Sequence, residues 1–169
     1  AGIRTTDLGR WLNGHQAIVR AMPNTPAQIQ AGVSALYAMP SVNAAQRTQA
    51  SSILQAIGSS LWLDDEEKMD AVTAISGSGP AYVFEFAAAL RDAGEAAGLP
   101  RDTAWKLARE TLLGSARLLA RTGQEPEALR DQVTSPNGTT FAGLQRMKAR
   151  DFRGVMKETV LAATARSEE

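Results

Sequence analysis

The spacing of hydrophobic and polar positions changes near residue 64 and divides the chain into two parts. Before that point, short apolar runs alternate with turns rich in proline and glycine. The runs predict strands at residues 17–22, 32–38 and 60–63, and a helix at residues 41–57 that Ser41 or Asn43 caps. So few strands cannot make an independent α/β sheet of ordinary size. We therefore predict that residues 1–63 are the C-terminal remnant of a larger sheet domain.

After residue 64 the apolar residues recur at helical spacing to the end of the chain. A long helix is predicted within Ile75–Pro100, because Pro80 suits a first helical position and Gly98 suits a helix end. Apolar residues cover so wide an arc of this helix that we expect burial from more than one side. Both an ordinary core helix and a helix at a subunit interface fit this pattern.

The remaining helices of residues 64–169 are predicted from the same periodicity, at residues 103–122, 126–133 and 141–148 and after residue 151. We expect Asp102 to cap the first of these and Asp151 to cap the last. The predicted fold is therefore mainly α, with a helical domain at residues 64–169 that follows the last strands and helix of a truncated α/β domain.

Composition excludes several classes of function. Lys and Arg number 18 and Asp and Glu also number 18, and no basic run occurs, so we predict neither a nucleic-acid partner nor a charged membrane surface. The chain has no cysteine and one histidine, His15, which excludes a thiol nucleophile and a Cys/His zinc site. His15 is expected at the surface. No apolar run approaches the ~18 residues of a membrane span, and we predict a cytoplasmic location.

Three loops are candidates for chemistry. In residues 134–140, Pro136 and Asn137-Gly138 favour a tight turn that leads into a helix, whose free N–H groups and threonine hydroxyls could bind a carboxylate. Residues 22–26 follow a strand end, where open α/β sheets bind ligands. A capped turn without a ligand and a simple loop are the alternative interpretations of these two segments, and local sequence alone favours them. The third candidate, residues 77–79, lacks the last glycine of a dinucleotide-binding fingerprint, and we reject it.

Three motifs occur in a specific order: MPNTPA at residues 22–27, DAVTAISGSGPAY at residues 70–82 and SPNGTT at residues 135–140. Together they resemble pyrroline-5-carboxylate reductase over essentially the whole chain. The resemblance implies reduction of 1-pyrroline-5-carboxylate to L-proline with NADP or NAD as cofactor. It implies a Rossmann-like sheet domain whose N-terminal part, with its phosphate-binding loop, this chain lacks. It also implies that the helical domain forms a homodimer or a higher homo-oligomer.

The resemblance also carries over site residues. The substrate carboxylate is expected at the turn, with backbone donors from its threonines and the hydroxyl of the second threonine near the substrate ring nitrogen; the residues are Asn137, Gly138, Thr139 and Thr140. Four residues are expected to border the cofactor: Ala1, Asn24, Glu66 and Gln132. The family usually has Gly-Gly where this chain has Asn137-Gly138, and commonly has Asn at the position of Gln132.

Because the chain begins Ala1-Gly2-Ile3, without Met, we expect a fragment or a processed chain. We expect it to be inactive alone, because the resemblance implies that only half of the active site is present. Two other readings stay open. One is a helical dimerisation module without catalysis. The other is the C-terminal domain of a related β-hydroxyacid-type dehydrogenase, which would carry an inward lysine on its central helix, whereas residues 80–97 contain no lysine.

Overall fold

The computed structural model describes residues 2–169, which pack as two compact units. The first unit runs to Ala81 and includes Lys157–Glu169, and the second is Tyr82–Met156. Ala1 lies outside the described residues. The fold is mainly α with a short sheet near the N-terminus, which confirms the predicted fold class. The predicted domain division at residue 64 stays a prediction.

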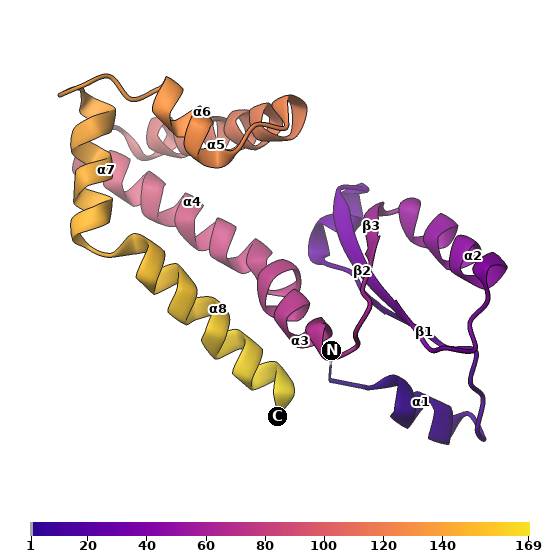
Figure 1. Ribbon diagram of the computed structural model, residues 1–169. Coiled ribbons are helices and arrows are strands. Elements are labelled where there is room, and N and C mark those ends of the chain that lie inside the picture. Colours follow the sequence, from indigo (N-terminus) through magenta and orange to yellow (C-terminus); the bar gives the residue numbers. More distant parts are fainter. Residues whose placement is uncertain (1) are drawn as a thin grey trace. The chain divides into compact units, whose positions relative to one another are not determined.

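The first unit is built on a three-stranded mixed sheet (Figure 1). Its strands are β1 (Val19–Met22), β2 (Gly32–Ala38) and β3 (Gly58–Trp62), in the order β1-β2-β3. β1 runs antiparallel to β2, whereas β3 runs parallel to it. The parallel pair is connected through helix α2 (Ala44–Gln55). Adjacent residues of β2 such as Ala35 and Leu36 point to opposite faces of the sheet, and both are buried, so the central strand is covered on both sides.

Helix α2 begins with a capping box at Asn43, which is one of the two predicted caps. The Asn43 side chain accepts the Gln46 N–H at 2.9 Å, and the Gln46 side chain accepts the Asn43 N–H at 2.9 Å. Side chains also fasten the helix to β3: Trp62 Nε1 donates to the Ser51 hydroxyl at 3.0 Å, and the Arg47 guanidinium lies 5.0 Å from the Trp62 ring centroid.

Two short helices that lie before residue 64 were not predicted. Helix α1 (Thr5–Trp11) precedes the sheet, and a 3₁₀ helix, η1 (Thr25–Ile29), follows β1. Helix α3 (Lys68–Val72) continues into a π-helical turn, η2 (Thr73–Gly77), which the Ser78 N–H closes by donating to the Thr73 carbonyl at 2.8 Å. Short helices of this kind lack the long periodicity that identifies a helix in a sequence.

The predicted long helices are present with similar boundaries. They are α4 (Gly79–Ala96), α5 (Arg101–Thr122), α6 (Pro126–Gln132), α7 (Thr139–Ala149) and α8 (Phe152–Glu168). α4 ends in a Schellman motif, in which Gly98 has a φ of 98° and the Leu99 N–H donates to the Gly94 carbonyl at 3.0 Å. Asp151 caps α8 as predicted, because its side chain accepts the Gly154 N–H at 3.2 Å.

The prediction that Asp102 caps α5 is wrong. The helix begins at Arg101, and the N-cap is Pro100, which has an extended backbone and provides no side-chain hydrogen bond. Asp102 therefore lies inside the first turn. Its negative charge there still interacts favourably with the helix dipole.

The second unit has almost no hydrophobic core of its own. Its buried apolar residues are Ala87, Ala104 and Ala108. Large apolar side chains of α4 and α5 are exposed instead, namely Val83, Phe84, Phe86, Leu90, Trp105, Leu107, Leu113, Leu118 and Leu119. The two helices approach closely where Gly94 faces Ala104, because a Cβ built on Gly94 would lie 3.0 Å from the Ala104 Cβ. An exposed apolar surface of this extent indicates a site of association.

Candidate functional site

The candidate substrate-binding turn spans Ser135 to Gly138 and forms as predicted. The Gly138 N–H donates to the Ser135 carbonyl at 3.0 Å and closes the turn. Pro136 holds the second position, and Asn137 at the third has a φ of 58°, the left-handed backbone that a type II turn requires there. Asparagine tolerates this conformation better than most residues. The turn is therefore compatible with Asn in place of Gly.

This turn gives a stability prediction for Asn137. We expect Asn137→Gly to leave the free energy of unfolding within about 0.5 kcal/mol of wild type, because glycine adopts positive φ freely. Asn137→Val should lower it by about 1–2 kcal/mol, because a β-branched side chain is strained there. Urea unfolding followed by circular dichroism measures both. Equal tolerance of valine and glycine would contradict the turn geometry.

Helix α7 starts directly after the turn, at Thr139, which is earlier than the predicted start at residue 141. Thr139 and Thr140 therefore lie in the first helical turn, and both are exposed. Gly138 is the N-cap and provides no side-chain acceptor. Within the described chain, the N–H groups of Thr139 and Thr140 have no hydrogen-bond acceptor. Free N–H groups at the positive end of a helix dipole suit a carboxylate.

An ion pair links α6, which precedes the turn, to the start of α8. The Arg153 guanidinium at the start of α8 donates to the Glu127 carboxylate of α6 at 2.7 Å. This hydrogen bond, with the attraction between the two charges, lowers the pKa of Glu127. Both side chains are at least half exposed, so the pair contributes little to the stability of the fold.

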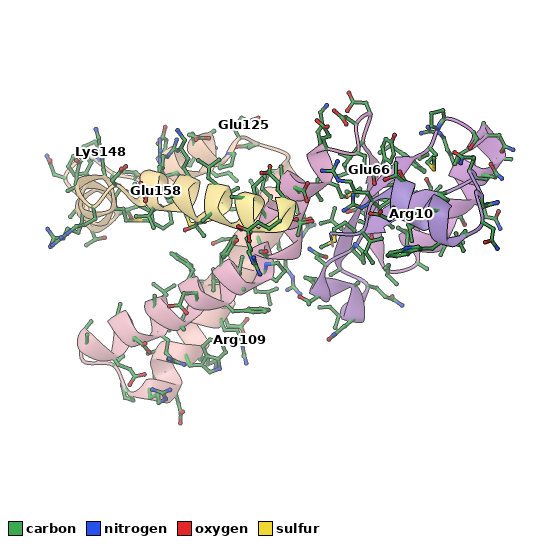
Figure 2. The ribbon with its side chains drawn as sticks, turned by 90° about the horizontal axis from the view of Figure 1, so that it is seen from below. Arg10, Glu66, Arg109, Glu125, Lys148 and Glu158 are labelled. Carbon is green, nitrogen blue, oxygen red and sulfur yellow. The ribbon has the colours of Figure 1, made fainter. Side chains whose placement is uncertain are left out.

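A groove of about 710 Å³ lies beside this segment in the second unit. Its apolar lining comes from Phe141, Leu144, Met147 and Phe152. Charged side chains surround these residues, among them Lys148, which Figure 2 labels. This groove was not predicted, because its lining depends on how α6, α7 and α8 pack.

Asn24, a predicted cofactor-bordering residue, lies in the first unit between β1 and η1. Its side-chain oxygen accepts the Val33 N–H of β2 at 3.0 Å, which fastens the loop after β1 to the central strand. Because the oxygen is the acceptor of this bond, the amide NH₂ is the group left for a ligand. That NH₂ has no hydrogen-bond partner among residues 2–169.

Glu66, also predicted to border the cofactor, accepts three hydrogen bonds inside the first unit. Its Oε1 accepts the Thr5 N–H at 2.8 Å and an Arg20 Nη1–H at 3.0 Å. Its Oε2 accepts the Thr5 hydroxyl at 2.6 Å. Thr5 is 2% exposed and Arg20 is 8% exposed, so the carboxylate satisfies polar groups that are buried. Glu66 is labelled among the violet ribbons of the first unit in Figure 2.

The pKa of Glu66 lies below its ordinary value of 4.5. Partial burial alone would raise this pKa, but the hydrogen bonds from Thr5 and Arg20 and the Arg20 charge together outweigh burial. A lowered folded-state pKa means that the ionised carboxylate stabilises the fold above its ordinary pKa. This stabilisation is lost as the pH falls through the lowered pKa.

The structure places the remaining predicted residues as follows. The Gln132 side chain donates to the Gln124 side chain at 2.7 Å, and both are exposed. Ala1 lies outside the described residues, so its place beside the cofactor stays a prediction. His15 is exposed, as predicted. Asn24 and Glu66 belong to the first unit, whereas Gln132 and the residues of the turn belong to the second.

The structure also bears on metal and membrane sites. Among residues 2–169, no three His, Cys, Asp or Glu side chains are grouped so that they could hold a metal ion. None of the helices in this part of the chain combines the length and apolar character that a membrane crossing requires.

The polar residues that hold the first unit together were not predicted from the sequence. Arg20 offered a signal, because an arginine inside an apolar strand needs a partner. Thr5 offered none, since its acceptor is 61 positions away in the sequence. Asp70 was likewise missed: it is buried and accepts the Ser167 hydroxyl of α8 at 2.7 Å, within the first unit.

Comparison with known proteins identifies the family whose members this chain resembles. Residues 66–169 match the family model described as "Pyrroline-5-carboxylate reductase dimerisation". The pyrroline-5-carboxylate reductase of Pseudomonas aeruginosa is 48% identical over 169 residues, which are 100% of this chain and 62% of that protein. This chain therefore spans about three fifths of the length of that curated relative.

Two solved structures share the fold. A pyrroline-5-carboxylate reductase from Coxiella burnetii has a TM-score of 0.95 and 38% identity, and the match covers 99% of this chain and 62% of that one. The Plasmodium falciparum pyrroline carboxylate reductase, solved with NADP bound, has a TM-score of 0.89 and 32% identity over 99% of this chain and 63% of that one.

Proposed function

The chain belongs to the pyrroline-5-carboxylate reductase family, and on that premise we propose that it is the C-terminal portion of an enzyme that reduces 1-pyrroline-5-carboxylate to L-proline with NADPH or NADH. The observation that supports this most directly is the turn at Ser135–Gly138, which leads into a helix with free N–H groups. The family match also argues against the β-hydroxyacid-type dehydrogenase.

The substrate carboxylate binds at the start of α7 in this proposal. The N–H groups of Thr139 and Thr140 donate to it, and Asn137 and Gly138 shape the turn that exposes them. The same N–H groups would be left without an acceptor in the absence of an anion or water. A planar carboxylate next to a small ring suits this end of the helix, because two adjacent donors fix both its position and its orientation.

The hydroxyl of Thr140 is proposed to lie near the substrate ring nitrogen, where it would orient the imine and contact the proton on that nitrogen. Bound NADPH or NADH would supply the hydride that reduces the imine carbon. The work of the protein is then to hold the substrate ring in one position, since correct placement of two reactants accounts for much of such a rate enhancement.

Only part of a cofactor site fits the described residues. The free NH₂ of Asn24 is a suitable donor to a cofactor acceptor, and the exposed side chain of Gln132 is available to exchange its bond with Gln124. Residues 2–169 contain no glycine-rich phosphate-binding fingerprint. We therefore propose that the chain borders the cofactor and does not bind it tightly or turn over alone.

A homodimer or a higher homo-oligomer is part of the proposal. Its support is the second unit, in which alanines are the buried apolar residues while most of the large apolar side chains are exposed. The family model that matches residues 66–169 is also named for dimerisation. The predicted cytoplasmic location stays a prediction.

The experiment joins this chain to the N-terminal part of the Pseudomonas aeruginosa relative that it does not cover. We expect the fusion to oxidise NADPH when 1-pyrroline-5-carboxylate is added, and the chain alone to show no turnover. In the fusion, Thr140→Val should lower kcat/KM about 10- to 100-fold, because the hydroxyl bond to a charged substrate is lost. Thr140→Ser retains the hydroxyl and serves as the matched control.

Two results would contradict the proposal. A soluble, folded fusion without turnover would favour the alternative of a non-catalytic dimerisation module. Normal turnover in Thr140→Val would remove Thr140 from the catalytic role and leave the turn with backbone binding only.

A further inference from the structure

Helix α1 has no local N-terminal cap, and Glu66 takes that place from a distance. Arg4 is the N-cap residue and provides no side-chain hydrogen bond to the first turn. The Thr5 N–H, which has no acceptor within the helix, donates instead to the Glu66 carboxylate at 2.8 Å. A negative charge at this end of the helix is also favoured by the helix dipole. The start of α1 thus depends on a residue that the chain reaches 61 positions later.

The Glu66 carboxylate has little capacity left for a ligand. A carboxylate offers about four acceptor positions, and the bonds from Thr5 and Arg20 fill three of them. Both oxygens are engaged. A direct contact with a cofactor would compete with the bonds to Thr5 and Arg20, which are nearly buried and hardly accessible to solvent.

The partners of Glu66 lie close in sequence to Ala1 and Asn24, which the family resemblance predicts beside the cofactor. Thr5 follows Ala1 by four positions, and Arg20 precedes Asn24 by four positions. Arg20 is in β1, so its position sets where the loop that contains Asn24 leaves the sheet. One carboxylate therefore connects the two chain segments that lead to these residues.

We propose that Glu66 is a positioning residue, which holds the start of α1 to β1 and acts on the cofactor only through these two segments. The inference rests on the proposed function for its catalytic consequence. Its structural part, the distant capping of α1, concerns this chain alone.

The first test measures amide hydrogen exchange at Thr5 in the 169-residue chain. Glu66→Ala should speed exchange at Thr5 about tenfold or more, because a charge-assisted hydrogen bond to the amide is lost. Glu67→Ala is the matched control, since Glu67 is the exposed neighbour, and it should leave exchange at Thr5 unchanged. Unchanged exchange in a folded Glu66→Ala variant would overturn the distant cap.

The second test uses the active fusion and compares Glu66→Ala with Thr5→Val, which removes the hydroxyl donor and keeps the shape. Both variants should raise KM for NADPH about threefold to tenfold and alter kcat less, and the double variant should be no worse than Glu66→Ala. Thr5→Ser should restore the wild-type KM. Thr6→Val, at the exposed neighbour of Thr5, is the control and should have no effect.

A rise in KM in Glu66→Ala but not in Thr5→Val would show a direct cofactor contact and overturn the proposal. Additive effects of the two substitutions would do the same, because residues that act through one contact do not add. If the unmodified fusion shows no turnover, the proposed function fails, whereas the exchange experiment still decides whether Glu66 holds α1.

Discussion

Phe84→Asp is expected to abolish self-association of the chain. Phe84 is 66% exposed in the single chain, so a monomer would tolerate the charge. In an oligomer that covers α4, the same position would bury an unpaired carboxylate and lose the apolar area of a phenylalanine. Phe86, which lies on another side of α4, is also exposed, so Phe86→Asp should act in the same direction.

The expected magnitude is large because a two-fold interface contains each substitution twice. Loss of one buried phenylalanine costs about 2–3 kcal/mol, and burial of an unpaired charge adds to that cost. Two copies together should raise the dissociation constant by about three orders of magnitude or more. Sedimentation velocity over a series of protein concentrations measures this change directly.

Glu85→Gln is the matched control, because Glu85 is the polar neighbour on the opposite side of α4 from the apolar stripe. It should leave the oligomer intact. A wild-type chain that is monomeric and stable at every concentration would remove the interface from α4. The same conclusion would follow if Phe84→Asp kept both the wild-type mass and the wild-type melting temperature.

The helices of residues 79–168 were predictable because their signals are local. Gly123 ends α5 and Pro126 begins α6, as predicted from the sequence. Gly98 ends α4 in the left-handed conformation expected of it. The error at Asp102 has the same local origin. Several residues near a helix start can act as its cap, and composition alone does not choose among them.

Helix α1 and the role of Glu66 were not predictable from local pattern. α1 is short, and no neighbouring side chain caps it. The carboxylate that accepts the Thr5 N–H belongs to Glu66, which follows all three strands of the sheet in the sequence. Nothing in the acidic run at residues 64–67 distinguishes Glu66 from the residues beside it. In the folded chain, Glu66 is the carboxylate that accepts hydrogen bonds from Thr5 and Arg20, whereas the acidic residues beside it are exposed.

The candidate site likewise has one part that local sequence predicts and one part that it does not. The turn at Ser135–Gly138 follows from Pro136 and Asn137, so its form could be predicted from a few adjacent residues. The free N–H groups of Thr139 and Thr140 follow from the start of α7. Which ligand they bind does not follow from either feature. That part of the proposal came from the motif order and is supported by the family match.

Gly58→Ala is expected to destabilise the first unit severely. Gly58 begins β3, lies opposite Gly32 of β2 and has a φ of 144°, a backbone conformation that other residues rarely adopt. A Cβ at this position would lie 1.9 Å from the Gly32 carbonyl oxygen. The obstacle is backbone in the central strand, which cannot move aside without breaking the pairing between β2 and β3.

The free energy of unfolding should fall by more than about 3 kcal/mol, a large part of the stability of a typical domain. Gly143→Ala is the matched control: Gly143 lies in the middle of α7, and a Cβ there meets nothing within 4 Å. This control should keep or raise stability by about 1 kcal/mol, because alanine favours a helix over glycine. Urea unfolding of both variants, followed by circular dichroism and tryptophan fluorescence, measures the difference. If Gly58→Ala unfolds at the wild-type urea concentration, the β2–β3 register is wrong, and the position of the Glu66 segment that follows β3 must change with it.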